Sequence, residues 1–187
     1  MKLFIPLLMA MMTITANAQN LEGMYFADQQ FVDQANEYVK NIDIAEQTGM
    51  DLDLEVDFRM FLNGDNIDLI IGVKTEAQNV SVEGLITFMG KFVKEGDFVN
   101  CDFNKDNIAV TLQKLESDDP QTQHEIEENE DMIYNMVEGM MDEAVTPLKD
   151  KLFKVCEFCK SFEMKSITDK SFTAVFKNDM EVNFIKP

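Results

Sequence analysis

Residues 50–73 read MDLDLEVDFRMFLNGDNIDLIIGV, and this stretch decides the fold. Apolar side chains occupy every even position from Met50 to Leu62, and charged side chains occupy most of the odd positions. Side chains that alternate with a period of two lie on opposite faces of a β-strand. Asn63-Gly64 then supplies the positive φ that a tight turn requires, and the alternation resumes at Ile67. The stretch therefore predicts a β-hairpin with one apolar face and one wet face.

The same alternation recurs on both sides of this hairpin. A strand from about Leu21 to Asp28 opens the domain. Further strands are expected at residues 80–88, 99–103, 108–112, 162–164, 172–176 and 180–184, with turns at Gly96-Asp97, Asn104 to Asn107 and Asn178-Asp179. About eight sequential strands with one apolar face can close into an up-and-down barrel, which leaves no sheet edge exposed. The predicted fold class is therefore mainly β, an antiparallel up-and-down barrel.

A helical period replaces the alternation between residues 119 and 160. Asp119-Pro120 is typical of a helix start, and Thr146-Pro147 repeats that pattern. We therefore expect a two-helix acidic insert before the last strands, with a break at Thr146. Apolar residues at helical spacing form a stripe on the first helix, which comprises Met132, Ile133, Met136, Val137, Met140, Met141, Ala144 and Val145. The segment Asp28 to Thr48 fits either a helix or a strand, and its spacing favours the helix slightly.

The first eighteen residues are typical of a secretory signal peptide. Lys2 precedes an apolar run from Leu3 to Met12, and Ala16-Asn17-Ala18 offers the small residues that signal peptidase needs. The apolar run is too short to span a bilayer. We expect cleavage after Ala18 and a product that is periplasmic or secreted.

Charge and length narrow the class of protein further. Of the 187 residues about 169 remain after cleavage, which is enough for a single domain over residues 19–187. The formal net charge of the full chain is −19, and such a surface repels phosphate backbones and anionic headgroups. We therefore expect no nucleic-acid partner, and the shortness of the N-terminal apolar run predicts no membrane span.

The sequence offers little support for catalysis. Cys156 and Cys159 form a C-x-x-C motif, but they lie in the last turns of the predicted helical insert, whereas reactive thiols sit at the start of a helix. Packed or locally bridged cysteines are the better interpretation, and Cys101 is expected to pack inward as a small hydrophobe. The single His124 lies among acidic residues, and Asp102, Asn104 and Asp106 lack the glycine and glutamate of a calcium loop. We expect no catalytic residue, no metal and no cofactor.

Four motifs occur in order along the chain. Leu21-Glu22-Gly23-Met24-Tyr25 has the form Gly-x-Trp, with Tyr in place of Trp. The run from Phe58 to Asp65 ends in Asn-Gly-Asp, and Gly90 to Asp97 has the form of a Gly-x-Tyr hairpin followed by Gly-Asp, with another aromatic residue in place of Tyr. Ile167 to Phe172 with Val182-Asn183-Phe184 forms the last motif. In this order the motifs resemble the first strand, the recurrent strand ending in Asn/Asp-Gly, the Gly-Asp hairpin and the closing hairpin of small exported bacterial lipocalin-like proteins, the calycins.

This resemblance implies a calycin-type barrel and, by analogy, a pocket for a small apolar molecule. If such a ligand binds, inward side chains would line its cavity: Phe58, Met60, Leu69, Ile71, Phe88 and Phe103. The alternative function is a protein-interaction module of the cell envelope, in which the acidic, Met-rich helices dock a partner protein. An exposed apolar stripe around Met136 and Met140 would favour this alternative.

Overall fold

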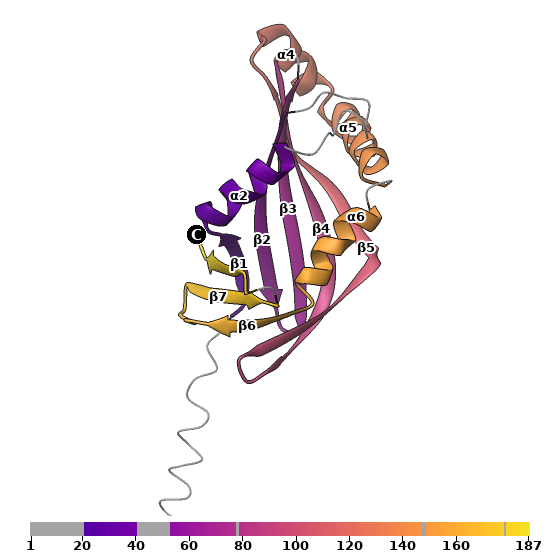
Figure 1. Ribbon diagram of the computed structural model, residues 1–187. Helices are drawn as coiled ribbons and strands as arrows, with labels where there is room; N and C mark the ends of the chain where they lie inside the picture. Colours follow the sequence, from indigo (N-terminus) through magenta and orange to yellow (C-terminus); the bar gives the residue numbers. More distant parts are fainter. Residues whose placement is uncertain (1–20, 41–52, 78, 147–148, 178) are drawn as a thin grey trace, which may run out of the picture.

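The computed structural model describes residues 21–40, 53–77, 79–146, 149–177 and 179–187, and Figure 1 gives its architecture. The described chain contains eight strands in the order β1 to β8, each antiparallel to its neighbours, and β8 pairs back onto β1 to close the sheet. The strands are β1 Gly23–Ala27, β2 Asp53–Asn63, β3 Asn66–Ala77, β4 Val80–Glu95, β5 Phe98–Ser117, β6 Ser161–Lys165, β7 Ser171–Phe176 and β8 Glu181–Ile185. The predicted mainly β class with sequential antiparallel strands is confirmed. The signal-peptide prediction falls on residues 1–18, outside the described residues.

The hairpin predicted from residues 50–73 is present. Strands β2 and β3 pair along their whole length, from Asp53 opposite Glu76 to Asn63 opposite Asn66. Gly64 has φ 60°, the left-handed conformation that glycine adopts without steric cost. The first residues of the predicted strand, Met50 to Leu52, lie outside the described part of the chain.

The closed sheet has strands of unequal length. Strands β2 to β5 contain 11 to 20 residues, whereas β1, β6, β7 and β8 contain five or six. Strand β1 pairs with β2 at residues 59–62, and β6 pairs with β5 at residues 98–100. The long strands therefore project beyond the short ones (Figure 1), and in this projecting half the outer edges of β2 and β5 have no neighbouring strand.

One apolar core fills the closed end and continues between the long strands. Its buried members come from every strand and from the helical insert: Tyr25, Val56, Met60, Leu62, Ile67, Leu69, Ile71, Ile86, Phe88, Val99, Cys101, Phe103, Val145, Cys156, Cys159, Phe162, Met164, Phe172, Ala174, Phe176, Val182 and Phe184. Within each strand these residues alternate with outward ones, as the period of two requires. The inward face predicted from sequence is the face that forms the core.

Strand β5 differs from the prediction. The expected strands at residues 99–103 and 108–112 are one continuous strand, and Asn104 to Asn107 do not form a turn between them. Phe103 lies opposite Gly90 and Ile108 lies opposite Phe88, so the four polar residues are an insertion across from Met89. Because β4 continues past the insertion, the chain bulges outward and returns to the same partner strand.

The helices also differ in part. Helix α2, Gln29–Lys40, confirms the favoured interpretation of the ambiguous segment, whose remainder lies outside the described residues. The described part of the insert contains three helices instead of two: α4 Pro120–Glu128, α5 Glu130–Val145 and α6 Lys149–Phe158. Asp119 caps α4 as predicted, since its carboxylate accepts from Thr122 N. The unexpected break is at Asn129, whose φ of −123° is not helical and whose Nδ2 donates to Glu125 O at 3.0 Å.

Candidate functional site: the outer face of the helical insert and the interior of the sheet

The free edge of β2 is covered by one side chain of α2. Asn36 donates from Nδ2 to Val56 O at 2.9 Å and accepts from Val56 N at 2.6 Å through Oδ1. A carboxamide that pairs with both backbone groups of one residue imitates a neighbouring strand. Because an unpaired strand edge invites association with other chains, this contact protects the edge as well as holding the helix.

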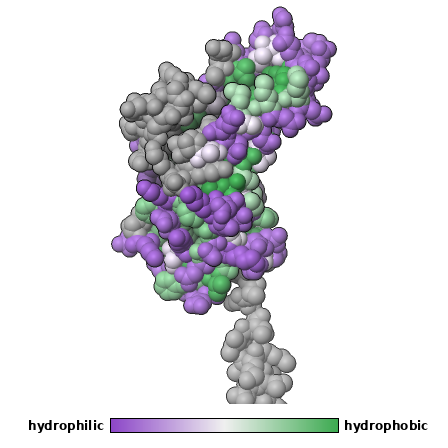
Figure 2. Space-filling model, turned by 90° about the vertical axis from the view of Figure 1, so that its right-hand side faces the viewer, coloured by the Kyte–Doolittle hydropathy of each residue, from purple (hydrophilic) through white to green (hydrophobic). Residues whose placement is uncertain are grey.

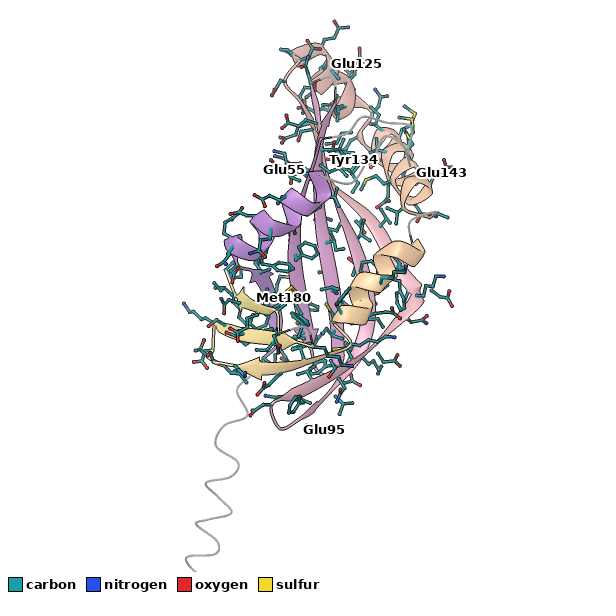
Figure 3. All side chains as sticks on the ribbon, in the orientation of Figure 1. Glu55, Glu95, Glu125, Tyr134, Glu143 and Met180 are labelled. Atoms are coloured by element: carbon teal, nitrogen blue, oxygen red, sulfur yellow. The ribbon has the colours of Figure 1, made fainter. Side chains whose placement is uncertain are left out.

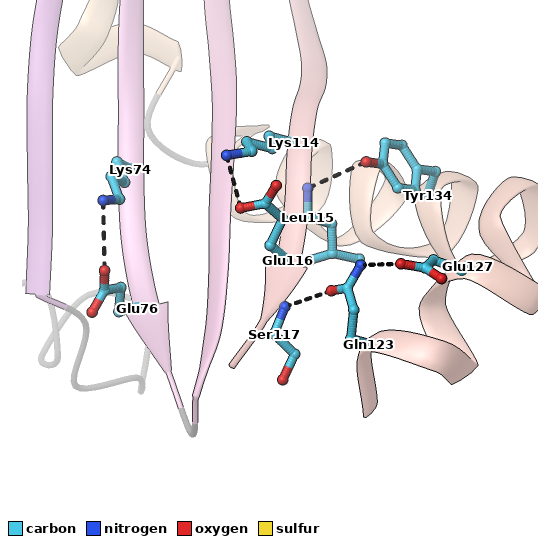
Figure 4. Close-up of polar contacts among 9 residues, drawn as sticks. All are labelled: Lys74, Glu76, Lys114, Leu115, Glu116, Ser117, Gln123, Glu127 and Tyr134. Carbon is cyan, nitrogen blue, oxygen red and sulfur yellow. Dashed lines mark hydrogen bonds and ion pairs between the residues drawn. The ribbon is translucent and has the colours of Figure 1, made fainter. Parts of the chain in front are cut away.

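The free edge of β5 is covered by the helical insert. Ser117 N donates to Gln123 Oε1 at 2.9 Å, and Gln123 donates in turn to Glu127 (Figure 4). Leu115 N donates to the Tyr134 hydroxyl at 3.3 Å. A further bond runs from Leu112 N to Glu138 Oε1 at 3.1 Å. Three successive attachments fix the orientation of α4 and α5 on the sheet.

A second apolar cluster lies beneath these attachments. Leu112 and Leu115 of β5 and Ile126 of α4 are buried in it. Four residues of α5 pack around them together with Val80 and Val82 of β4: Ile133, Tyr134, Val137 and Met141. The tip of the Met141 side chain occupies the space in which Gly84 would carry a Cβ. The inner face of α5 is therefore packed against the sheet.

Three methionines of α5, each one position before a residue that packs on the sheet, are exposed instead. Met132, Met136 and Met140 are 66%, 58% and 55% exposed, and we call these three residues the methionine face. In Figure 2 apolar residues gather in a patch on the upper lobe, which polar residues surround. The sequence placed these methionines in one stripe with Ile133 and Val137, but in the structure only Ile133 and Val137 pack against the sheet, from half-buried positions. Exposed apolar residues grouped on one surface mark an interaction site more often than scattered ones do.

The surroundings of the methionine face are acidic. Residues 115–148 contain eleven Asp and Glu residues and no Lys or Arg. Figure 3 shows Glu143 directed away from the sheet, whereas Tyr134 is directed toward it. His124 contacts Glu128 of its own helix at 3.3 Å. This lobe therefore presents a strongly negative field around an apolar stripe, and that field attracts cations and basic peptides.

The six residues predicted to line a cavity are brought together. Met60, Leu69, Ile71, Phe88 and Phe103 are buried in the main core, and Phe58 packs against that core from a half-buried position. The Phe58 ring meets Phe31 of α2 edge to face, with centroids 5.2 Å apart. The period of two was sufficient to find these residues, because it alone decides which side chains of a strand point inward.

Tyr25 is an interior residue that the sequence indicated only as part of a motif. Its side chain is fully buried and packs edge to face on Phe172 at 4.9 Å, and Lys186 Nζ lies 4.9 Å from its ring centroid. Gly23, with φ 131°, gives the Lys186 side chain room to approach. Among the described residues the buried Tyr25 hydroxyl has no hydrogen-bond partner. A buried hydroxyl without a partner is costly, at about 1–3 kcal/mol.

The three cysteines are buried and are not arranged for thiol catalysis. Cys156 lies in the last turn of α6 and Cys159 follows its end, as expected from sequence. Burial raises the pKa of each thiol to about 12, with the Cys159 thiol adding to the effect on the other two. Since the thiolate is the reactive form, these groups are poor nucleophiles at neutral pH.

Within the described ranges, no three His, Cys, Asp or Glu side chains are grouped so that they would hold a metal ion. None of the described helices combines the length and the apolar character needed to cross a bilayer. No family model, curated protein or solved structure matches the chain. The resemblance to lipocalin-like proteins therefore depends on the four sequence motifs alone.

Proposed function

We propose that this is an exported, non-catalytic interaction protein whose methionine face binds a basic amphipathic helix of an envelope protein. The exposure of Met132, Met136 and Met140 on a helix fastened to the sheet is the observation that carries the proposal. The flexible thioether side chains of methionine adapt to the apolar face of a partner helix. Met132 and Met140 are eight positions apart, which corresponds to about 12 Å along the helix axis and matches two turns of such a helix.

The charge around the methionine face selects the partner. The eleven acidic residues of 115–148, a stretch without Lys or Arg, favour Lys and Arg on the flanks of the partner helix and raise the rate of encounter. Burying a half-exposed methionine contributes roughly 1 kcal/mol, so three of them provide about 3 kcal/mol before charge attraction is added. We expect binding that weakens as salt is added, because screening reduces the attraction.

A direct test uses a synthetic amphipathic helix of Leu and Lys as the probe. Met136→Gln and Met140→Gln keep the length of the side chain and its helix propensity while removing apolar character. Together they are expected to weaken probe binding about 30-fold, from roughly 1 kcal/mol per residue. Met89→Gln is the matched control, since Met89 is also exposed but lies on β4. Titration calorimetry that finds equal affinity for wild type and the double variant would refute the proposal.

A second candidate function is binding of a small apolar molecule inside a lipocalin-like barrel. The unpartnered hydroxyl of Tyr25 favours it, because a ligand with one hydrogen-bonding group would satisfy that hydroxyl. Native mass spectrometry of protein purified from its source tests this idea directly. A retained mass that is lost or reduced in Tyr25→Phe supports an interior ligand, and a bare chain in both proteins contradicts it.

A further inference from the structure

Cys101 and the end of α6 meet, although they are far apart in the sequence. The backbone N of Cys101 donates to Lys160 O at 2.7 Å, which sets Cys159, the preceding residue, beside β5. Strands β5 and β6 pair immediately beyond this contact, through Asn100 opposite Ser161. Cys101 and Cys159 are each only 9% exposed and belong to the same apolar core.

Cys159 is the neighbour that the other two thiols share. Its charge raises the pKa of Cys101 and also that of Cys156, after the larger effect of burial in both cases. Cys156 and Cys159 are separated by three positions across the end of α6. Cys156 lies within the last turn of α6, whereas Cys159 lies beyond its end, next to the residue that bonds to β5.

We propose that Cys101 and Cys159 form a disulfide that joins β5 to the end of the helical insert, and that Cys156 remains a free thiol. The bond forms when the two thiols each lose a hydrogen to a disulfide oxidant such as oxidised glutathione, which is reduced to two thiols. It closes a loop of about 58 residues that contains all of α4, α5 and α6, and closure of so long a loop restricts the unfolded chain strongly. This linkage is independent of the proposed partner of the methionine face.

Burial of the two thiols determines when the disulfide can form. Thiols with a pKa of about 12 are almost entirely protonated at neutral pH, and exchange requires the thiolate. The bond therefore forms during folding, before the core excludes the oxidant. For this reason the test begins with the reduced, unfolded full chain and refolds it in a glutathione redox buffer.

Peptide mapping identifies the pairing. After alkylation without reduction, the protein is digested with trypsin and a glutamate-specific protease, because Glu157 separates Cys156 from Cys159. We expect a linked pair of peptides that carry Cys101 and Cys159, and an alkylated Cys156. A bond between Cys156 and Cys159, or three alkylated cysteines after oxidative refolding, would overturn the proposal.

Two serine variants provide the matched comparison. Cys156→Ser is expected to keep the linked peptides and to melt roughly 8 °C lower after reduction, from the loop length and the size of the domain. Cys101→Ser is expected to lose the linked peptides and to melt at the same temperature with and without reductant. Equal sensitivity of the two variants to reductant would contradict the assignment.

Discussion

Asn36→Ala tests the idea that helix side chains take the place of missing strands at the free edges. The Asn36 carboxamide makes two bonds to the backbone of Val56 and a third to Val32 O, at 3.0 Å. Without it the N–H and C=O of the buried Val56 lose their partners. Each unsatisfied backbone group costs about 1–3 kcal/mol, and entry of water at an edge lowers this cost. We therefore expect the free energy of unfolding to fall by roughly 2–3 kcal/mol. Replacing Asn by Ala within a helix returns about 0.5 kcal/mol through propensity.

The matched control is Asn135→Ala on α5. Asn135 is exposed, and its Nδ2 donates to Asp131 O of its own helix at 2.6 Å. It gains the same helix propensity but uncovers no strand edge, so we expect a neutral or slightly stabilising effect.

The assay is urea or thermal unfolding followed by far-ultraviolet circular dichroism, because the chain has no Trp. The net loss in Asn36→Ala corresponds to a fall in melting temperature of about 4–10 °C for a domain of this size. Equal melting temperatures for the two variants would refute the reasoning, since the Asn36 contact would then contribute no more than an exposed bond within a helix. A loss for Asn36→Ala together with faster aggregation would support edge protection.

Two other substitutions test the packing of the site and its dependence on pH. Gly84→Val is expected to destabilise the protein by about 1–3 kcal/mol in urea unfolding, and Met141→Ala in the same chain is expected to recover part of that loss, because the two side chains compete for one space. Burial opposes ionisation of Asp28, but bonds from Phe31 N and from the backbone and side chain of Asn183 outweigh it and lower its pKa. A lowered pKa means that the stabilisation is present above about pH 4 and is lost as pH falls through the folded-state pKa. Asp28→Asn should therefore be less stable than wild type at pH 7, and the difference should shrink in melting scans toward pH 2; a constant difference would contradict the assignment.

The hairpin, the inward face and the start of α4 could all be predicted from local sequence. Alternation from Met50 onward specifies which side chains point inward, and Asn63-Gly64 specifies where the chain reverses. Asp119-Pro120 specifies the helix start, since a capping carboxylate and a proline at the first position suit a helix and little else. These features depend on residues within a few positions of one another.

The polar run Asn104 to Asn107 shows where local reasoning fails. Four polar residues between apolar alternations are typical of a turn, but β4 continues alongside, and its pairing on both sides of Met89 keeps β5 one strand. The break at Asn129 is similar, because the helical stripe continues across it. Only the way the insert packs on the edge of β5 decides where α4 ends and α5 begins.

The sequence by itself determined the strand periodicity, the six residues that meet in the interior and the acidic character of the insert. The tertiary structure decided that Met132, Met136 and Met140 face solvent while their neighbours Ile133 and Val137 pack inward. Both sets are apolar and one residue apart, so helical spacing alone cannot choose between them. The choice comes from the bonds of Tyr134 and Glu138 to the free edge of β5, which exists only because β6 is short. The same closure of distant strands brings Cys101 to Lys160 and buries Tyr25, since contacts between distant residues arise only when the sheet has closed.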